Sequence, residues 1–333
     1  MPDGHNSTVL TFRRLDDAPM RGRMLQPDRE FSLTVRVDLE DRSFHEETHL
    51  NLDGESFFGE SLMCEEGGFT FAPASGRELK VSVNRGRFHA EVEPVYNVGH
   101  PVEASRGQAE VGDAYSPGWF EIPLKPSDES VLMLSSESTT IPPVIRNETL
   151  VSFEERLRFS MKAFVVNRGG GKTVVAGYPW FLDWGRDTFI AARGLLSAGW
   201  VDEVFGIVKA FAKFEDRGSL PNVLNGENAS NRETSDAPLW FGKVCAELAE
   251  TKGEDIFAER MADGRQLREV LISIGCGYRD GTPQGIRMDL ESGLIWSPSH
   301  FTWMDTNFPA GTPREGYPVE IQALWIELLG LLS

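Results

Sequence analysis

The chain has 333 residues, 40% of them hydrophobic, which is enough for two domains with cores of their own. Its formal net charge of −18 argues against nucleic acid and against an anionic membrane as partners, because both bind basic surfaces. A neutral polysaccharide is compatible with such an acidic protein.

Cysteine usage and hydropathy bear on location. Cys64, Cys245 and Cys276 are widely spaced and odd in number, so they provide neither a disulfide framework nor a CxxC metal pair. The sequence has no apolar signal region near its start and no run of about 18 apolar residues that could span a bilayer. We therefore expect a cytoplasmic protein.

Residues 1–142 are expected to form an antiparallel β-sandwich. Short runs of strand-forming residues recur there, and turn residues such as Asp53-Gly54 separate them. The runs are Thr8–Arg13, Phe31–Val37, Glu78–Val83, Phe88–Val95, Gly118–Ile122 and Ser130–Leu134. A Pro142-Pro143 pair then breaks the periodicity, and residues 143–149 are interpreted as a linker.

From residue 150 the hydrophobic period becomes helical. Leu150, Phe153, Leu157, Met161 and Phe164 recur at spacings of three and four. Further helices are expected at 187–198, 202–214, 236–251 and 254–274, and from 318 to the chain end, with a long loop over 275–317. Six helices joined by alternating short and long loops suggest an α/α toroid over residues 150–333.

Two short motifs match functional patterns but are not expected to have the corresponding function. His45 to His49 spells HExxH, but zinc binding there needs a helix and a third ligand, and Asn51, Asp53 and Gly54 follow at once. The run from Gly169 to Thr173 resembles a phosphate loop, but Val166 stands where the leading glycine belongs. We expect no zinc site at the first and a flexible turn at the second.

Residues 177–190, GYPWFLDWGRDTFI, combine five aromatic rings with two aspartates and one arginine. Aromatic rings stack on the C–H faces of sugars, while carboxylates and guanidinium groups bind hydroxyls, so this composition suits a sugar site. The alternative is the start of a core helix, with Trp180 and Trp184 buried and Arg186-Asp187 as its cap. Composition alone leaves both interpretations open.

A resemblance favours the sugar site. Residues 177–190 resemble a signature of the glucosidase domain of glycogen debranching enzymes, and three later stretches match that domain in the same order. These are NRETSDAPLWF (231–241), GTPQGIRMDLESGLIWSPSHFTWMD (281–305) and GTPREGYPVEIQALW (311–325). Residues 95–124 look like the end of the family's N-terminal β-domain. Both domains would then be incomplete, the β-domain at its start and the twelve-helix toroid at its end.

The resemblance implies hydrolysis of α-1,6-glucosidic branch points in glycogen or limit dextrin, with inversion and without a cofactor. Inverting hydrolysis takes an acidic carboxyl group and a basic carboxylate on opposite sides of the bond. Asp305, at the end of the TWMD motif, matches the family's general acid. The family's general base lies beyond that motif, and no residue here matches it.

Substrate contacts are expected from residues around these motifs. Arg186 and Asp187 form the predicted clamp for the terminal glucose, and Asp236 is either a further contact or a helix N-cap. The remaining candidates are Trp180, Asp183, Trp184, Trp240, Trp303 and Glu320. Each tryptophan is also a plausible core residue, and Glu320 could instead favour a helix dipole.

Three other functions stay open on the sequence. A glucan-binding fragment without catalysis would keep the clamp but lack the base. A glucoamylase-like α-glucosidase would share the fold and favour α-1,4 bonds. A zinc peptidase would act through His45 and His49, and a metal assay would test it.

Overall fold

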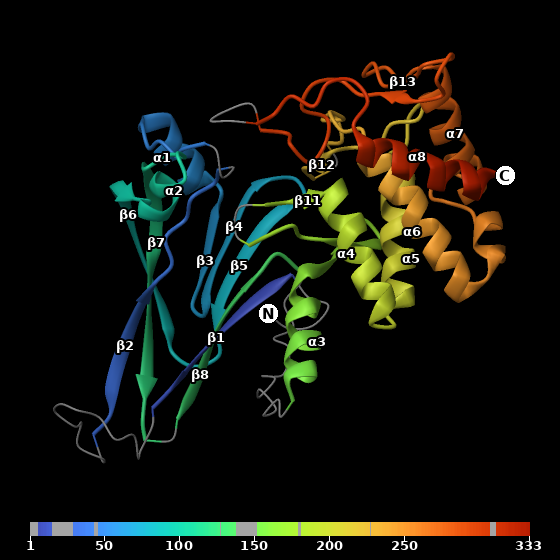
Figure 1. Cartoon of the computed structure of the whole chain (residues 1–333). Helices are drawn as coiled ribbons and strands as arrows, with labels where there is room; N and C mark the ends of the chain where they lie inside the picture. The colour runs from blue at the N-terminus through green and yellow to red at the C-terminus, as the bar shows by residue number, and fades with distance from the viewer. Residues whose placement is uncertain are drawn as a thin grey trace. The chain divides into compact units, whose positions relative to one another are not determined.

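The computed structural model describes residues 6–14, 29–42, 46–126, 128–137, 152–178, 181–226, 228–306 and 311–333. The chain divides into two compact units, Met1–Leu150 and Val151–Ser333, which we call the β unit and the helical unit (Figure 1). The predicted linker at 143–149 lies outside the described residues.

The β unit contains two antiparallel sheets. The larger has the strand order β1-β8-β5-β4-β3, and the smaller has the order β2-β7-β6 (Figure 1). The strands of the larger sheet are β1 (Ser7–Arg13), β3 (Leu62–Glu65), β4 (Gly68–Ala74), β5 (Arg77–Val83) and β8 (Glu129–Ser135). Those of the smaller sheet are β2 (Phe31–Arg36), β6 (Arg87–Gly99) and β7 (Val111–Leu124), and two short helices, α1 (Leu52–Glu60) and α2 (Pro101–Ser105), complete the unit.

One cluster of buried side chains joins the two sheets. Phe69 of β4 lies 5.4 Å from Phe88 of β6 and 6.3 Å from Phe120 of β7, measured between ring centroids. Val81 of β5 and Ile122 of β7 are fully buried in the same cluster. The predicted strand-rich, antiparallel unit is therefore found, with its core between the sheets.

The helical unit follows from residue 151. Its helices are α3 (Phe153–Phe164), α4 (Gly185–Ser197), α5 (Val201–Ala212), α6 (Ala237–Lys252), α7 (Leu267–Asp280) and α8 (Val319–Leu332), with a 3₁₀ turn at η1 (Glu254–Ala258). Three short strand pairs accompany the helices. β9 (Val165–Arg168) with β10 (Gly171–Val174) and β13 (Arg287–Met288) with β14 (Ile295–Trp296) form hairpins, whereas β11 (Asp183–Trp184) pairs with β12 (Val223–Leu224) from the far side of α4 and α5. Of the predicted turn at the GGGKT run, Gly169 and Gly170 form the bend of the β9–β10 hairpin, and Gly171 to Thr173 belong to strand β10.

The predicted helix over 254–274 is wrong. Only η1 occupies its start, and α7 begins at Leu267 and continues to Asp280. Gly264 lies between them with φ +89°, a left-handed conformation that interrupts a helix. A capping box between Gln266 and Glu269 then starts α7, so the long loop begins at 281 instead of 275.

Alternate helices of this unit pack against each other. Arg186 and Arg193 follow one another along α4, and their partners Asp236 and Glu247 follow in the same order at α6. The two helices therefore run parallel, with α5 as the return segment. Further on, α6 packs against α8, and Lys243 pairs with Glu327 across that contact.

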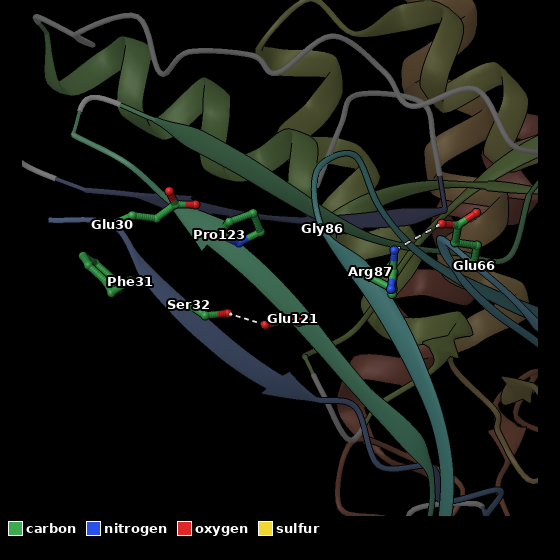
Figure 2. Close-up of a pocket in the computed structure, with 8 residues that line it drawn as sticks. All are labelled: Glu30, Phe31, Ser32, Glu66, Gly86, Arg87, Glu121 and Pro123. Carbon is green, nitrogen blue, oxygen red and sulfur yellow. Dashed lines mark hydrogen bonds and ion pairs between the residues drawn. The ribbon is translucent and has the colours of Figure 1, made fainter.

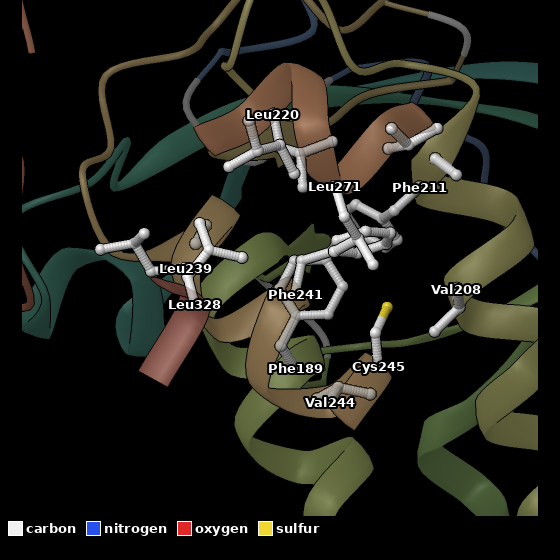
Figure 3. Close-up of a cluster of buried hydrophobic side chains, with 14 of the residues drawn as sticks. Phe189, Val208, Phe211, Leu220, Leu239, Phe241, Val244, Cys245, Leu271 and Leu328 are labelled. Carbon is white, nitrogen blue, oxygen red and sulfur yellow. The ribbon is translucent and has the colours of Figure 1, made fainter. Parts of the chain in front are cut away.

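Aromatic rings from three helices meet at the centre of the helical core (Figure 3). The Phe189 ring of α4 lies 4.9 Å from Phe211 of α5 and 5.5 Å from Phe241 of α6, both edge-on. All three rings are fully buried. This contact holds the start of α4, which carries the Arg186-Asp187 pair, against its neighbours.

The two remaining sequence questions concern metal and membrane. His45 lies outside the described residues, and His49 sits in a non-helical segment where it contacts Glu47. Within the described ranges, no group of three His, Cys, Asp or Glu side chains is arranged to hold a metal ion. In the same ranges, no helix is long and apolar enough to cross a membrane.

Truncating the central ring tests this core. We expect Phe189→Ala to lower the free energy of unfolding of the helical unit by about 3–5 kcal/mol, because a buried ring is replaced by a cavity. The next residue on the same helix is the matched control: Ile190 is 45% exposed, and Ile190→Ala should stay within about 0.5 kcal/mol. Calorimetric unfolding of both variants measures the difference, and equal losses would contradict the packing described.

Candidate active site

The DWGRD segment is held in place by its neighbours before α4 begins. Asp183 and Trp184 pair with β12, and the Gly185 amide donates to the carbonyl of Asn222 over 2.8 Å. A Cβ atom on Gly185 would lie 2.8 Å from the Pro221 carbonyl oxygen and 3.1 Å from the Ala237 Cβ. The first turn of α4 can therefore approach the first turn of α6 only because residue 185 has no side chain.

The guanidinium of Arg186 contacts three separate parts of the helical unit. Its Nε donates to Asp236 Oδ2 over 2.5 Å, its Nη1 to Asp305 Oδ2 over 3.0 Å, and its Nη2 to the Thr302 carbonyl over 2.7 Å. Burial alone would lower the pKa of Arg186, but the two carboxylates outweigh burial and leave that pKa raised. Arg186 therefore ties α4 to α6 and to the segment carrying Asp305.

Asp236 faces Arg186 instead of capping its own helix. It stands at the N-cap position of α6, but its side chain makes no capping hydrogen bond. Its Oδ1 accepts from the Thr234 hydroxyl over 2.8 Å, and that hydroxyl in turn accepts from the Ala237 amide over 3.3 Å. Thr234 thus does the capping and leaves Asp236 for Arg186.

Ser235 holds the segment that carries Asp305. Its amide donates to the Phe301 carbonyl over 2.7 Å, and its hydroxyl lies 2.8 Å from that of Ser297. Behind it, the buried Tyr278 of α7 donates to the Ser235 carbonyl over 2.7 Å. Hydrogen bonds at the amide, the hydroxyl and the carbonyl of Ser235 therefore hold the segment that leads to Asp305.

Asp187 is the accessible carboxylate beside this network. Partial desolvation by the surrounding protein raises the pKa of Asp187, Arg186 lowers it, and the nearby Asp305 and Asp236 raise it further. A carboxylate that is accessible and imperfectly compensated is suited to accept hydrogen bonds from an incoming polyol.

Asp183 lies elsewhere. It is only 5% exposed, and its Oδ2 is 2.9 Å from Arg168 Nε in an ion pair without good hydrogen-bond geometry. Burial raises the pKa of Asp183, and Arg168 partly offsets that rise. The structure thus directs this side chain inward, as a support for the β11 segment.

The predicted tryptophans have different surroundings. Trp180 lies outside the described residues, and Trp184 is half-buried at the N-cap of α4. Trp240 packs on the helical core with Arg193 over its ring, 5.5 Å from the centroid. Trp303 is 56% exposed in the segment next to Asp305, where a ring is available for stacking.

Glu320 reaches this segment through an arginine. It forms a two-pronged ion pair with Arg314, whose guanidinium lies 5.9 Å from the Trp303 ring centroid. Glu320 therefore positions Arg314 beside the exposed tryptophan.

Sequence reasoning missed Thr234, Arg168, Arg314 and the Thr302 carbonyl. The spacing of Thr234 to Ala237 is a capping signal that points to the first of these. The others carry no local signal, because their partners lie far along the chain.

Two family models match this chain. Residues 159–333 match the family described as amylo-alpha-1,6-glucosidase, and residues 1–131 match the glycogen debranching enzyme N-terminal family. The chain belongs to the glycogen debranching enzyme family. Glycogen debranching enzyme of Saccharomyces cerevisiae is 29% identical over an alignment of 196 residues. That alignment covers 42% of this chain and 13% of the yeast protein, so the chain spans a small part of this relative.

Two glycines of α4 test how this debranching-family site is built. Gly185→Ala should destabilise the helical unit by about 1–3 kcal/mol, because the new methyl group meets the Pro221 carbonyl oxygen and the Ala237 side chain. Gly194 has open space around it, so Gly194→Ala should stabilise the same helix by about 0.5–1 kcal/mol. Thermal unfolding of both variants gives the signs, and a stabilising Gly185→Ala would contradict the close approach.

The raised pKa of Asp187 predicts a pH-dependent effect on stability. Since the folded carboxyl holds its proton more tightly than the unfolded one, the wild type loses stability as the pH rises from about 4 through the raised value. Asp187→Asn should remove that loss. We expect it to be more stable than the wild type at pH 7, by at most about 1 kcal/mol because solvent screens an accessible side chain.

Asp202 supplies the control of opposite sign. The hydrogen bond from the Lys252 side chain lowers the pKa of Asp202, so Asp202→Asn should lose stability at pH 7 and approach the wild type as the pH falls below about 4. Unfolding curves at pH 3 and pH 7 compare the variants. A destabilised Asp187→Asn at pH 7 would refute the expected effect.

Proposed function

We propose that this chain binds the terminal glucose of an α-1,6 branch in glycogen or limit dextrin and supplies the general acid for its inverting hydrolysis. The observation that carries the proposal is the contact of Arg186 with both Asp236 and Asp305, beside the accessible Asp187. These residues lie within the stretch that matches the amylo-alpha-1,6-glucosidase family.

In this proposal Asp305 protonates the leaving oxygen. Its Oδ2 accepts from Arg186, so Oδ1 is the oxygen that would carry the proton. Asp187 accepts hydrogen bonds from sugar hydroxyls, and Arg186, with five N–H donors in all, keeps two after its three protein contacts. Trp303 provides a stacking surface, and Trp180 and Trp184 are proposed to extend it.

An inverting reaction also needs a carboxylate about 6.5–9.5 Å from the acid to activate water. We assign no described residue to that task. Acid, base and water complete this chemistry, so the proposal involves no cofactor. The cysteines are free thiols, which supports our proposal that the protein works in the cytoplasm.

We further propose that the helical unit forms part of an α/α toroid. The packing of α4 on α6 and of α6 on α8 supports this, because a toroid is built from alternate helices in contact. Arg186 and Glu320 lie in the first turns of α4 and α8, and Asp236 lies at the N-cap of α6. The proposed site thus gathers at helix N-termini, which favour negative charge and hydroxyl oxygens.

A second candidate function is glucan binding without cleavage. Inverting hydrolysis needs a base as well as an acid, and the fact that we assign no base among the described residues favours this candidate. A glucoamylase-like preference for α-1,4 bonds is separated from debranching by comparing isomaltose with maltose as substrates.

Glucose release from a branched limit dextrin tests the proposal. We expect the wild type to release glucose and Asp305→Asn to be slower by about 10²–10⁴-fold, the usual contribution of a general acid. Glu291→Gln is the matched control, an exposed carboxylate of the same long loop whose loss should leave the rate unchanged.

Binding of the same dextrin distinguishes the two candidates. Dextrin bound by both proteins without release from either would favour the binding function and refute catalysis by this chain. Equal release by the wild type and Asp305→Asn would refute Asp305 as the acid.

A further inference from the structure

The smaller sheet of the β unit has one buried face and one solvent face. Along β7, Phe120 and Ile122 are fully buried, whereas Trp119, Glu121 and Pro123 alternate with them and point outward. The register places partners beside these residues on the same face. Arg36 and His89 flank Trp119, Thr34 and Arg87 flank Glu121, and Ser32 lies opposite Pro123.

Trp119 is held rigidly on this face. Its ring stacks on His89 with centroids 4.0 Å apart and 13° between the planes, and its Nε1 donates to Glu91 Oε2 over 3.1 Å. His89 Nε2 lies 3.1 Å from Glu121 Oε2. A large aromatic residue fixed by two neighbours on a solvent-facing sheet is a preformed surface for stacking.

A hollow of about 540 Å³ adjoins this surface (Figure 2), within the usual size range of ligand pockets. Glu121 links the two, because it lines the hollow and contacts His89. The full lining is Glu30, Phe31, Ser32, Glu66, Gly86, Arg87, Glu121 and Pro123. Phe31 and Pro123 thus give the hollow apolar walls beside carboxylates, a hydroxyl and a guanidinium.

The charges of the hollow identify the class of ligand. Its three carboxylates oppose an anion, yet each already has a partner: Glu30 pairs with Lys125, Glu66 with Arg87, and Glu121 accepts from Ser32. The pairs with Lys125 and Arg87 are long, at 3.7 and 3.9 Å, so those carboxylates remain open to other donors. In the described ranges no three carboxylate, histidine or cysteine groups converge on a metal. A neutral polyol, which both donates and accepts hydrogen bonds, fits this set.

From these observations we infer that the Trp119–Glu121 face is a second carbohydrate site, which binds a linear segment of α-glucan. The row from Trp119 to Pro123 spans about 13 Å of strand, a length suited to an oligosaccharide rather than a single sugar. The choice of α-glucan rests on the proposed function, since a branched glucan substrate offers long linear segments besides its branch points. Such a site would hold the polymer while the helical unit acts on a branch.

Titration with maltoheptaose tests this site in the full chain carrying Asp187→Asn, which weakens the proposed site of the helical unit. We expect the Trp119 indole N–H signal, identified by its loss in Trp119→Phe, to shift on titration in an NMR spectrum. Trp119→Ala in this background should weaken maltoheptaose binding about ten-fold through the lost stacking surface, and Glu121→Gln should weaken it less. Tyr96→Ala, which removes an exposed ring from β6, is the control and should change affinity less than about two-fold.

The outcomes separate this site from the active site. A shifted Trp119 signal without glucose release from limit dextrin by the wild type would support this site and refute the catalytic proposal. An unmoved Trp119 signal, or unchanged affinity in Trp119→Ala with an intact thermal transition, would overturn the second site and leave the catalytic proposal as it was.

Discussion

The helical unit depends on one mostly buried guanidinium. Arg186 contacts the start of α6 through Asp236 and the long loop through Thr302 and Asp305. A cation in this position needs anions nearby, and the buried carboxylate of Asp236 needs a cation. Each charge therefore offsets the cost of burying the other. The arrangement also brings together residues more than a hundred positions apart in the chain. The chemistry proposed for Asp305 is inseparable from this electrostatic balance.

Asp187 is the member of the group that this balance leaves least satisfied. Its neighbours include two carboxylates and one cation, and the cation is already shared between those carboxylates. Perturbed carboxyl groups of this kind concentrate at functional sites. In the β unit, by contrast, the carboxylates around Trp119 each have a partner. The two proposed sites would thus bind sugar by different means. The first would use hydrogen bonds from sugar hydroxyls to Asp187, and the second would use stacking on Trp119.

Much of this organisation could be predicted from local patterns. The helical period from Leu150 to Phe164 predicts α3, and the helices expected at 187–198, 202–214 and 236–251 correspond closely to α4, α5 and α6. The predicted helix over 254–274 was wrong because Gly264 interrupts it with a left-handed backbone conformation. Hydrophobic periodicity does not detect a single residue of this kind. The site was predictable only as a set of motifs. Which carboxylate meets Arg186, and that Asp183 turns inward to Arg168, depend on tertiary contacts that no spacing records.

The hydrogen bond from Tyr278 to Ser235 has a consequence for how substitutions in this chain act. Tyr278 lies on α7, stacks near Trp325 of α8 and has no exposed surface, yet its hydroxyl supports the residue that holds the Asp305 segment. Damage to the interior of α7 would therefore reach the proposed acid by mechanical displacement, without altering any group that touches sugar. Variants with a normal surface and a normal set of charged residues could then lose turnover while keeping their fold. Substitutions that impair the proposed site would then include some inside the hydrophobic core.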